Sequence, residues 1–325
     1  MKIGFYIKWP KNSISSRGNV VGDELYGEQL SKTIRKKGNI ECEVYAPNYL
    51  PSQKLDIMIY LNDTPPLFEF SDKHILYIQN GYGETAEYLI SKLVKYNYDG
   101  YIFFSKKLKD IYDNKYRSKG LPFSLYLPFG VDTDFFYPRQ KRDDLSFEVA
   151  YVGNDIKGEE ATMRYIYPAI NFNFGLFGNW TIPKHRFKLW KNFLPQPKYK
   201  KVLAKISKGK IPQEDIPYLY SSSKIILNCT LPVCIEWDVI TSRTFEVLAC
   251  NGFLITDIVP SALETLKDYV VFTTGYQDLI DKIKYYLKNE DERIKISVKG
   301  YDFVKENASL SKRVDELLNY IQKVL

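Results

Sequence analysis

Residues 238–257 have the sequence DVITSRTFEVLACNGFLITD, and our prediction of the fold begins with this stretch. Its apolar residues predict a helix over residues 243–250 and a buried strand over residues 253–256. The Asn-Gly pair at residues 251–252 is typical of the turn that separates two such elements. A helix that leads through a short turn into a buried strand is one unit of an alternating α/β chain with a parallel sheet.

The same alternation continues in both directions from this stretch. The other strands that we predict cover residues 3–7, 41–46, 56–61, 75–79, 100–104, 148–152, 172–177 and 224–228. The helices that we predict cover residues 24–37, 84–95, 106–116, 159–170, 198–205, 212–221, 276–288 and 310–324. A proline-containing stretch that runs into the charged residues 141–144 interrupts the pattern, as a linker between two domains does.

We therefore predict an α/β chain with two Rossmann-like domains that face each other across a cleft. Residues 1–138 form the first domain and residues 139–308 the second, which agrees with a length of 325 residues. Residues 309–325 form a closing helix. Its apolar stripe must bury against one of the two domains. The stripe consists of Leu310, Val314, Leu317, Leu318 and Ile321.

The composition is that of a globular protein with a basic charge. Hydrophobic residues make up 45% and charged residues 26%, and the formal net charge is +7, which favours anionic partners. The lysine-rich stretches are interrupted by apolar residues at helical spacing. This pattern indicates solvated helix faces rather than a nucleic-acid-binding arm, so we predict no nucleic-acid partner.

The cysteines, histidines and N-terminal residues bound the compartment and the metal chemistry. The four cysteines fit neither a disulfide framework nor a CxxC pair, and two histidines argue against a zinc site with His ligands. The first residues turn polar after a short apolar run, which indicates a first strand rather than a signal peptide. No apolar run approaches the length of about 18 residues that a membrane helix needs. We predict a cytoplasmic, reduced protein.

A candidate anion site lies where the helix over residues 243–250 begins. Ser242 and Arg243 stand at this N-terminus, where amide donors and the helix dipole favour a diphosphate. Glu246, about one turn further, can accept two hydrogen bonds from a ribose. The alternative is structural: Glu246 complements the helix dipole, and Arg243 pairs with Asp238.

Two loops that follow predicted strands are further candidates. In residues 151–158, YVGNDIKG, the glycines let the backbone approach a phosphate, which Lys157 or Arg164 could neutralise. In the loop at residues 20–25, Gly22 and Asp23 precede the first helix. Asp23 is either catalytic or a cap of that helix. Neither loop is a GxGxxG fingerprint, so a dinucleotide cofactor gains little support.

These motifs resemble a known family. Residues 238–257 resemble the signature of GT-B glycosyltransferases of group 1 type, which consists of an acid, seven residues, Glu, small residues, Gly and a hydrophobic strand. The sequence SRTFEVLACNGFLITD is most similar to the CgeB-like, spore-maturation branch of this family. The resemblance extends to the base-binding loop, the interdomain linker, the phosphate loop and the first helix of the acceptor domain. These are residues 209–228, 127–138, 151–158 and 22–38, respectively.

The resemblance implies a GT-B fold, a nucleotide-sugar donor and a set of site residues. Glu246 would hold the donor ribose and Asp238 the donor sugar, while Lys210 and Ile211 would meet the nucleobase through backbone groups. In GT-B proteins the terminal helix commonly crosses back to the first domain, and we expect the same of residues 309–325. The remaining donor-side residues are Gly22, Lys157, Arg164, Ser242, Arg243 and Thr244, and the catalytic candidates are Asp238 and Asp23.

The chain departs from the family pattern at two places near the donor sugar. Asp238 stands where group 1 enzymes carry a Glu, and its shorter side chain changes its reach. Residues 79–81, Gln-Asn-Gly, stand where group 1 members often have a histidine. Both departures bear on the stereochemical outcome, and we expect retention rather than inversion.

The sequence Asp132-Thr133-Asp134 has the form of the DxD motif that binds a divalent metal in GT-A transferases. It lies in the linker pattern, without the surroundings that a GT-A site needs. We interpret Asp132 as a turn and hinge residue, and we predict neither a metal nor another cofactor.

The predicted function is glycosyl transfer from a nucleotide-diphospho-sugar to an acceptor hydroxyl. The acceptor could be a glycan, a lipid-linked glycan or a protein, and the basic, aromatic-rich composition also suits peripheral association with the inner face of a membrane. Two alternatives remain. The first is a sugar-nucleotide epimerase or phosphorylase on the same fold, and the second is a non-catalytic carbohydrate- or nucleotide-binding protein.

Overall fold

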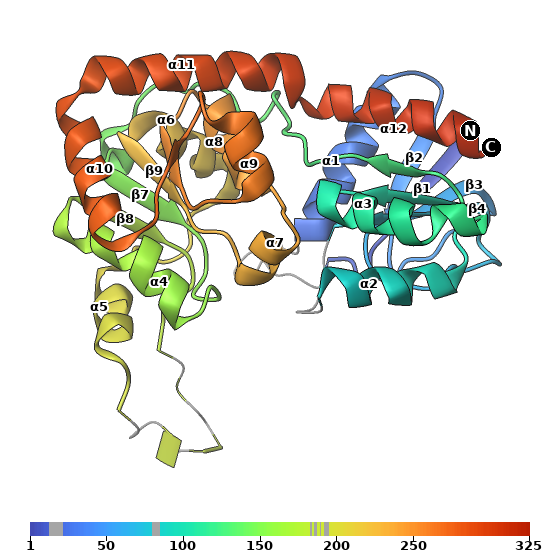
Figure 1. The fold of residues 1–325 in the computed structure, drawn as a ribbon, viewed down its shortest axis with the longest axis horizontal. Helices are drawn as coiled ribbons and strands as arrows, with labels where there is room; N and C mark the ends of the chain where they lie inside the picture. The colour runs from blue at the N-terminus through green and yellow to red at the C-terminus, as the bar shows by residue number, and fades with distance from the viewer. Residues whose placement is uncertain (13–21, 80–84, 183, 185–186, 189, 192–194) are drawn as a thin grey trace. The chain divides into compact units, whose positions relative to one another are not determined.

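The computed structural model contains two compact α/β units, each with its own parallel sheet (Figure 1). It describes residues 1–12, 22–79, 85–182, 184, 187–188, 190–191 and 195–325. Unit 1 consists of Met1–Asp132, Val233–Ile240 and Asn307–Leu325, and unit 2 consists of Thr133–Pro232 and Thr241–Glu306.

Unit 1 is built on six strands in the order β2-β1-β3-β4-β5-β6, all paired in parallel. The strands are β1 (Lys2–Tyr6), β2 (Glu41–Tyr45), β3 (Leu55–Tyr60), β4 (Ser71–Ile78), β5 (Gly100–Phe103) and β6 (Ser124–Tyr126). The helices are α1 (Gly22–Lys36), α2 (Ala86–Leu93), α3 (Lys106–Lys115) and α12 (Leu310–Val324), with 3-10 turns at Val94–Tyr96 and Arg117–Lys119. The sequence patterns do not predict β6, which is only three residues long.

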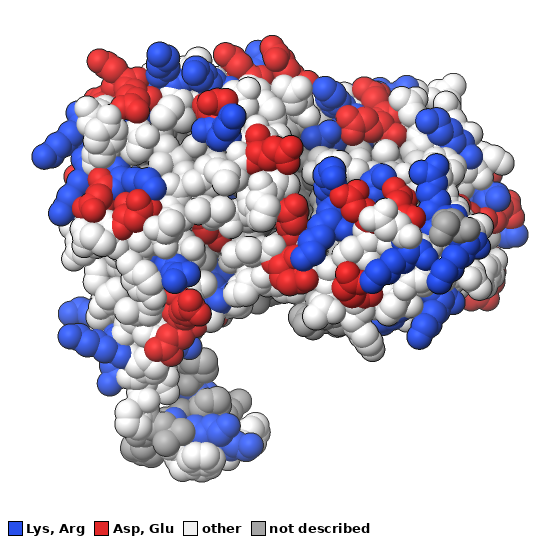
Figure 2. Space-filling model, in the orientation of Figure 1, with Lys and Arg blue, Asp and Glu red and all other residues white. Residues whose placement is uncertain are grey.

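Two of these helices begin at side-chain caps that the sequence supplies. The Thr85 hydroxyl accepts a hydrogen bond from the amide of Tyr88, and the Ser105 hydroxyl accepts one from the amide of Leu108. Both caps satisfy amides that have no partner within the first turn of a helix. Over α2 and α3, lysines are interspersed with acids (Figure 2), and Lys106 and Lys109 pair with Asp110 and Asp113.

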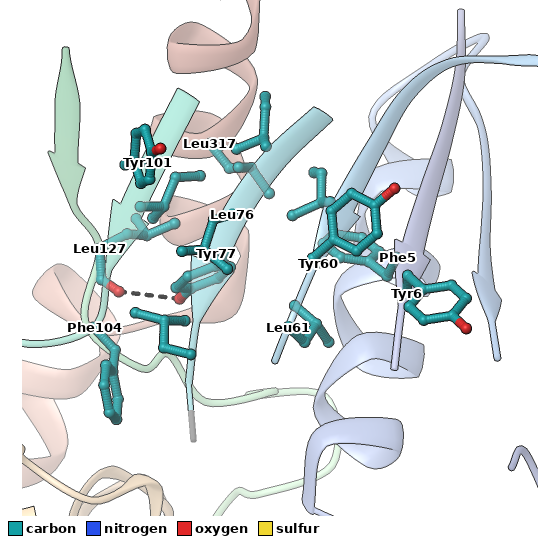
Figure 3. Packing of buried hydrophobic residues seen from close by; sticks show 14 of the residues in the cluster. Phe5, Tyr6, Tyr60, Leu61, Leu76, Tyr77, Tyr101, Phe104, Leu127 and Leu317 are labelled. Carbon is teal, nitrogen blue, oxygen red and sulfur yellow. Dashed lines mark hydrogen bonds between the residues drawn. The ribbon is translucent and has the colours of Figure 1, made fainter. Parts of the chain in front are cut away.

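Aromatic residues fill the core of unit 1 (Figure 3). Tyr60, Tyr77 and Tyr101 are fully buried on the central strands. A buried hydroxyl needs a hydrogen-bond partner. The Tyr77 hydroxyl donates to the carbonyl oxygen of Leu127 at 3.0 Å, and this bond ties the segment after β6 to β4.

The closing helix α12 packs on unit 1, which confirms the expected return to the first domain. The Tyr320 hydroxyl accepts a hydrogen bond from the amide of Tyr101 at 2.8 Å and donates to the carbonyl oxygen of Phe123 at 2.7 Å. Gly100 makes room for this contact, because a Cβ there would lie 2.8 Å from the Tyr320 hydroxyl. Val131 also exchanges backbone hydrogen bonds with Ala308 and Leu310.

One segment of unit 1 comes from within the stretch that the sequence patterns assign to the second domain. Val233–Ile240 follows the start of α7 (Pro232–Glu236) and inserts Trp237 and Val239 into the core of unit 1. The Ser105 hydroxyl donates to the Trp237 carbonyl oxygen. The observed units therefore differ from the predicted domains, residues 1–138 and 139–308, because a large buried indole fixes this segment to unit 1.

Unit 2 is built on five parallel strands in the order β11-β10-β9-β7-β8. The strands are β7 (Val149–Val152), β8 (Phe174–Phe177), β9 (Ile225–Asn228), β10 (Leu254–Thr256) and β11 (Val271–Phe272). The helices are α4 (Glu159–Tyr165), α5 (Lys198–Ile206), α6 (Ile216–Ser222), α8 (Ser242–Ala249), α9 (Pro260–Leu266), α10 (Tyr276–Lys288) and α11 (Glu290–Asn307), with 3-10 turns at Asp143–Leu145, Tyr167–Asn171 and Gln213–Asp215. All residues of β8, β9 and β10 are buried, as expected of a parallel sheet that is covered on both faces.

No helix within the described residues is long and apolar enough to cross a membrane.

Candidate functional site

The start of α8 is arranged as an anion site in unit 2. Thr241 is the N-cap residue, and its side chain accepts no hydrogen bond from the amides of the first turn, while its hydroxyl lies 3.5 Å from that of Thr244. Ser242, Arg243 and Thr244 follow in that turn, where amide donors and the helix dipole carry partial positive charge. The amide of Thr244 bonds the carbonyl oxygen of Thr241 at 3.1 Å, so the helix is well formed from its first residue.

Arg243 is held by polar and aromatic neighbours. Its Nη1 donates to Oδ1 of Asn228 at 3.1 Å, and its guanidinium carbon lies 5.4 Å from the ring centre of Tyr151. Burial by itself disfavours the charged guanidinium, but the neighbouring Tyr151, Tyr220 and Glu246 outweigh burial and raise the pKa of Arg243. Arg243 therefore stays cationic, which an anion-binding role requires.

Glu246 lies one turn after Arg243 on the same face of α8, since residues three apart are neighbours on a helix. Burial raises the pKa of Glu246, while the charge of Arg243 and a hydrogen bond from Ser242 oppose that rise. A carboxylate at this position can accept hydrogen bonds from two adjacent hydroxyls of a ribose.

The loops after β7 and β8 approach each other closely at two glycines. A Cβ at Gly178, where φ is +128°, would lie 2.1 Å from the carbonyl oxygen of Gly153, so only glycine fits there. The amide of Gly178 also donates to the carbonyl oxygen of Gly209 at 2.8 Å. These contacts bring the exposed Lys210 and the half-buried Ile211 to the carboxyl end of β8, beside the loop that contains Lys157.

Lys157 and Arg164 lie in different surroundings. Lys157 is buried. Burial raises the pKa of the neighbouring Asp257, and hydrogen bonds from Thr230 and Thr256 together with the charge of Lys157 oppose that rise. Arg164 packs against the loop before α10, where a Cβ at Gly275 would lie 2.2 Å from its Cγ, and its guanidinium carbon lies 5.4 Å from the ring centre of Tyr276. The structure therefore groups Lys157 with Asp257 and Arg164 with the β11–α10 loop.

A second polar cluster lies at the carboxyl edge of the unit 1 sheet. Asp23, buried in the first turn of α1, accepts a hydrogen bond from Nδ2 of Asn62 at 2.8 Å, and Gly22 begins the same helix. Oδ1 of Asn62 in turn accepts the amide of Lys8 at 3.0 Å. Gln79 follows β4 and is 7% exposed, and its side chain lies at the hydroxyl of Tyr77. Residues 20–21 and 80–81, which belong to the predicted motifs, lie outside the described residues.

Asp63 is a charged member of this edge that the sequence patterns do not single out. Its carboxylate pairs with Lys8 at 3.0 Å and with Lys92 at 2.6 Å. Burial raises the pKa of Asp63, but the two lysines outweigh burial and lower it below its ordinary value. The charge of Asp63 is thus balanced within the unit.

The two acids of the signature belong to different units. Asp238 lies in the Val233–Ile240 segment of unit 1 and has a left-handed backbone, with φ of 59°, while Glu246 belongs to unit 2. The DxD sequence at residues 132–134 is also divided between the two units. Asp132 ends a segment of unit 1, and Thr133 and Asp134 begin unit 2.

Several residues at the carboxyl edge of the unit 2 sheet do not stand out in the sequence. Asn228 and Thr230 at the end of β9, and Asp257 after β10, form a buried hydrogen-bonded group with Arg243. Asn228 ends a predicted strand, Thr230 and Asp257 follow predicted strands, and ligands of parallel sheets bind at these carboxyl ends. Their place after a strand was the available signal, because asparagine, threonine and aspartate are common in loops.

Comparisons with known proteins bear on the family and on the fold. Residues 168–319 match the family described as glycosyl transferase-like. The spore protein CgeB of Bacillus subtilis (strain 168) is 24% identical over 123 residues, which cover 35% of this chain and only 38% of CgeB.

Two solved structures are similar over nearly their whole length. Sucrose-phosphate synthase from Thermosynechococcus elongatus has a TM-score of 0.67 at 13% identity, and the match covers 99% of this chain and 98% of that one. HepE from Anabaena, in complex with UDP and glucose, has a TM-score of 0.64 at 12% identity and covers 99% of both chains. At such identities the likeness shows the fold alone. The chain therefore has the GT-B fold and carries a glycosyl transferase-like domain, as its resemblance to GT-B glycosyltransferases of group 1 type predicts.

Proposed function

We propose that this protein is a glycosyltransferase that moves a sugar from a nucleotide-diphospho-sugar to an acceptor hydroxyl, without a metal ion and with retention of configuration. The observation that carries this proposal is the pair of Arg243 and Glu246, one turn apart at the start of α8. A cation at a helix N-terminus suits a diphosphate, and a carboxylate beside it suits a ribose. The UDP in the HepE structure supports a nucleotide ligand on this fold.

The donor binds on unit 2 in this proposal. Glu246 accepts the ribose hydroxyls, and the backbone groups of Lys210 and Ile211 bind the nucleobase beside Gly178. The diphosphate lies on the first turn of α8. The residues that hold it are Ser242, Arg243, Thr244 and Lys157, with Arg164 and Gly22 as outer donor-side residues.

The chemistry is stabilisation of a departing nucleoside diphosphate. As the bond between the anomeric carbon and the phosphate oxygen breaks, negative charge develops on the diphosphate. Fixed cations and helix amides stabilise that charge without reorganising, which is the work that a metal does in other transferases. With retention, the acceptor oxygen enters on the face that the phosphate leaves, so the departing phosphate oxygen can take the acceptor proton.

The acceptor binds at the edge of the unit 1 sheet. Asp23 accepts a hydrogen bond from the acceptor hydroxyl and orients its oxygen, while Asp238 contacts the donor sugar. These are groups that bind hydroxyls, as a glycan or lipid-linked glycan presents them.

The segment between β8 and α5 supports peripheral binding to a membrane. Phe187 is 97% exposed and Trp190 is 62% exposed, and Lys188 and Lys191 stand next to them. Exposed aromatic residues flanked by lysines are typical of surfaces that bind anionic lipids. The protein should sediment with vesicles that contain an anionic lipid, and the double variant Phe187→Ala, Trp190→Ala should stay in the supernatant. Equal sedimentation of both proteins would argue against this part of the proposal.

A panel of nucleotide sugars tests the activity. Each donor is incubated with the protein and a mixture of glycan acceptors, in buffer with EDTA, and products are identified by mass spectrometry and by the anomeric coupling in NMR. Transfer with retention is the expected result. An epimerised sugar nucleotide, or a sugar phosphate formed with added phosphate, would favour an epimerase or a phosphorylase. Binding with no turnover on any donor would favour a non-catalytic protein.

A further inference from the structure

A chain of buried hydrogen bonds connects Arg243 to the carboxylate of Asp257 at the carboxyl edge of the unit 2 sheet. Asn228 ends β9 and is 3% exposed, and Asp257 follows β10 and is 1% exposed. Thr230 and Thr256 lie between them and are also buried. Two adjacent strand ends of unit 2 are therefore linked by polar side chains rather than by apolar packing.

The direction of every bond in this chain is fixed by its two ends. A guanidinium can only donate and a carboxylate can only accept. Nη1 of Arg243 donates to Oδ1 of Asn228 at 3.1 Å, which leaves Nδ2 as the donor of the Asn228 amide. Nδ2 lies 3.1 Å from the hydroxyl of Thr256 and 3.4 Å from that of Thr230.

The hydroxyls of Thr230 and Thr256 continue this chain of hydrogen bonds to Asp257. Oδ1 of Asp257 accepts the hydroxyl of Thr230 at 2.9 Å and that of Thr256 at 3.1 Å. Oδ2 of Asp257 accepts the amide of Thr230 at 2.8 Å. Three donors thus satisfy this buried carboxylate, and a rotation of Asn228 would break bonds at both of its ends.

We propose that Asn228 is a positioning residue that fixes the guanidinium of Arg243 for the donor diphosphate, with Asp257 as the anchor of the chain. This inference rests on the proposed function and deepens it, because it concerns the same donor site. Asn228 engages one of the five N–H donors of the guanidinium. Its contact acts together with the neighbouring Tyr151 and Tyr220 to hold the fork that we assign to the phosphate oxygens.

A neutral amide at position 228 can orient the guanidinium of Arg243 and also preserve its positive charge. A carboxylate at position 228 would also hold the guanidinium, but it would cancel the positive charge that attracts a diphosphate. An alanine would keep the charge and lose the orientation. The amide of Asn228 does both tasks, and the negative charge of Asp257 stays one hydroxyl further away, where Thr230 and Thr256 solvate it.

Calorimetry with UDP and uridine on three variants tests the inference. Asn228→Ala should weaken UDP binding about ten-fold while uridine affinity changes less than about two-fold, since only the diphosphate meets Arg243. Asn228→Asp has the same shape, and its melting temperature reports whether the variant is folded. Its UDP affinity, relative to that of the wild type, should be lowest near neutral pH and should recover as the introduced carboxyl is protonated. Asn173→Ala, which changes the same residue type at an exposed position just before β8, is the matched control and should bind UDP like the wild type.

A double-variant cycle separates positioning of Arg243 from other effects. In an Arg243→Ala background, Asn228→Ala should cause no further loss of UDP affinity. The inference would be overturned by a full further loss in that background, by equal losses for uridine and UDP, or by wild-type affinity in Asn228→Ala. A wild-type protein that bound none of UDP, GDP, ADP and dTDP would overturn the proposed function as well, so the two failures are distinguishable.

Discussion

At the scale of single residues, loss of the Glu246 side chain should weaken binding of the donor ribose. Glu246→Ala should weaken nucleoside-diphosphate binding by about 1–3 kcal/mol, because two donor hydroxyls lose their acceptor. Calorimetry measures this loss, and Glu264→Ala on the exposed face of α9 is the matched control. A 2′-deoxynucleoside diphosphate should lose less than the ribose form. Unchanged affinity in a folded Glu246→Ala protein would remove the ribose from this site.

Arg243 and Lys157 should contribute unequally to the diphosphate. Arg243→Ala should cost about 2–3 kcal/mol of UDP binding and Lys157→Ala about 1 kcal/mol, because a guanidinium fork engages two oxygens and an ammonium acts as a point charge. Uridine binding should change much less than UDP binding in both variants. Equal losses for the two ligands would place these cations away from the phosphates.

The raised pKa of Glu246 predicts a pH dependence of nucleoside binding. Burial raises this pKa, so the carboxylate becomes protonated and loses acceptor capacity at a higher pH than an exposed glutamate does. Uridine affinity should therefore fall as the pH is lowered from about 7 to about 5, a range in which uridine itself does not titrate. Glu246→Gln should show a flatter profile in the same titration. A wild-type profile no steeper than that of Glu246→Gln would contradict the assignment.

The sequence predicts part of this site at the residue scale and omits the rest for a physical reason. Arg243 and Glu246 stand out because they share one helix turn, and the spacing is visible in the sequence. Asn228 and Asp257 are 29 positions apart in the printed sequence, and only the pairing of β9 with β10 brings them together. A polar residue after a strand indicates an edge of the sheet, but it does not name its partner.

At the scale of elements, the contact of α12 with unit 1 predicts where stability is lost. Tyr320→Phe removes the hydroxyl that bonds Tyr101 and Phe123, so the free energy of unfolding should fall by about 1–3 kcal/mol. Urea denaturation followed by fluorescence measures it, and Tyr88→Phe, at an exposed position of α2, is the control. Truncation before Ser309 should destabilise unit 1 more strongly. Equal stability of Tyr320→Phe and the wild type would show that packing alone holds the helix.

One long helix that the sequence patterns miss has an unusual buried face. The 18-residue helix α11 (Glu290–Asn307) is not predicted, because its buried face is polar and small and consists of Arg293, Ser297, Gly300 and Val304. Such a face gives no apolar period to detect. The helix predicted over residues 159–170 ends at Tyr165 instead, and Pro168 lies in the 3-10 turn that follows, where its ring is tolerated.

At the scale of the whole molecule, the fixed charges of the donor site predict turnover without a divalent ion. Activity in EDTA should equal activity in added Mg²⁺ or Mn²⁺, because Arg243, Lys157 and the start of α8 supply the positive charge that a metal would provide. Asp132→Asn and Asp134→Asn should leave the metal response unchanged. Loss of all turnover in EDTA, restored by Mn²⁺, would assign the DxD residues to a metal after all.

The way the chain alternates between the two units limits how hybrids can be made from its gene. The five segments of the units alternate along the chain, so the polypeptide passes from one unit to the other four times. Neither unit is encoded by one uninterrupted stretch of the gene. A hybrid made by joining gene halves near codon 138 would give unit 1 a foreign Trp237 segment and a foreign closing helix. Donor specificity should instead be transplanted as two cassettes, codons 133–232 and 241–306, with codons 233–240 and everything after 306 left in place.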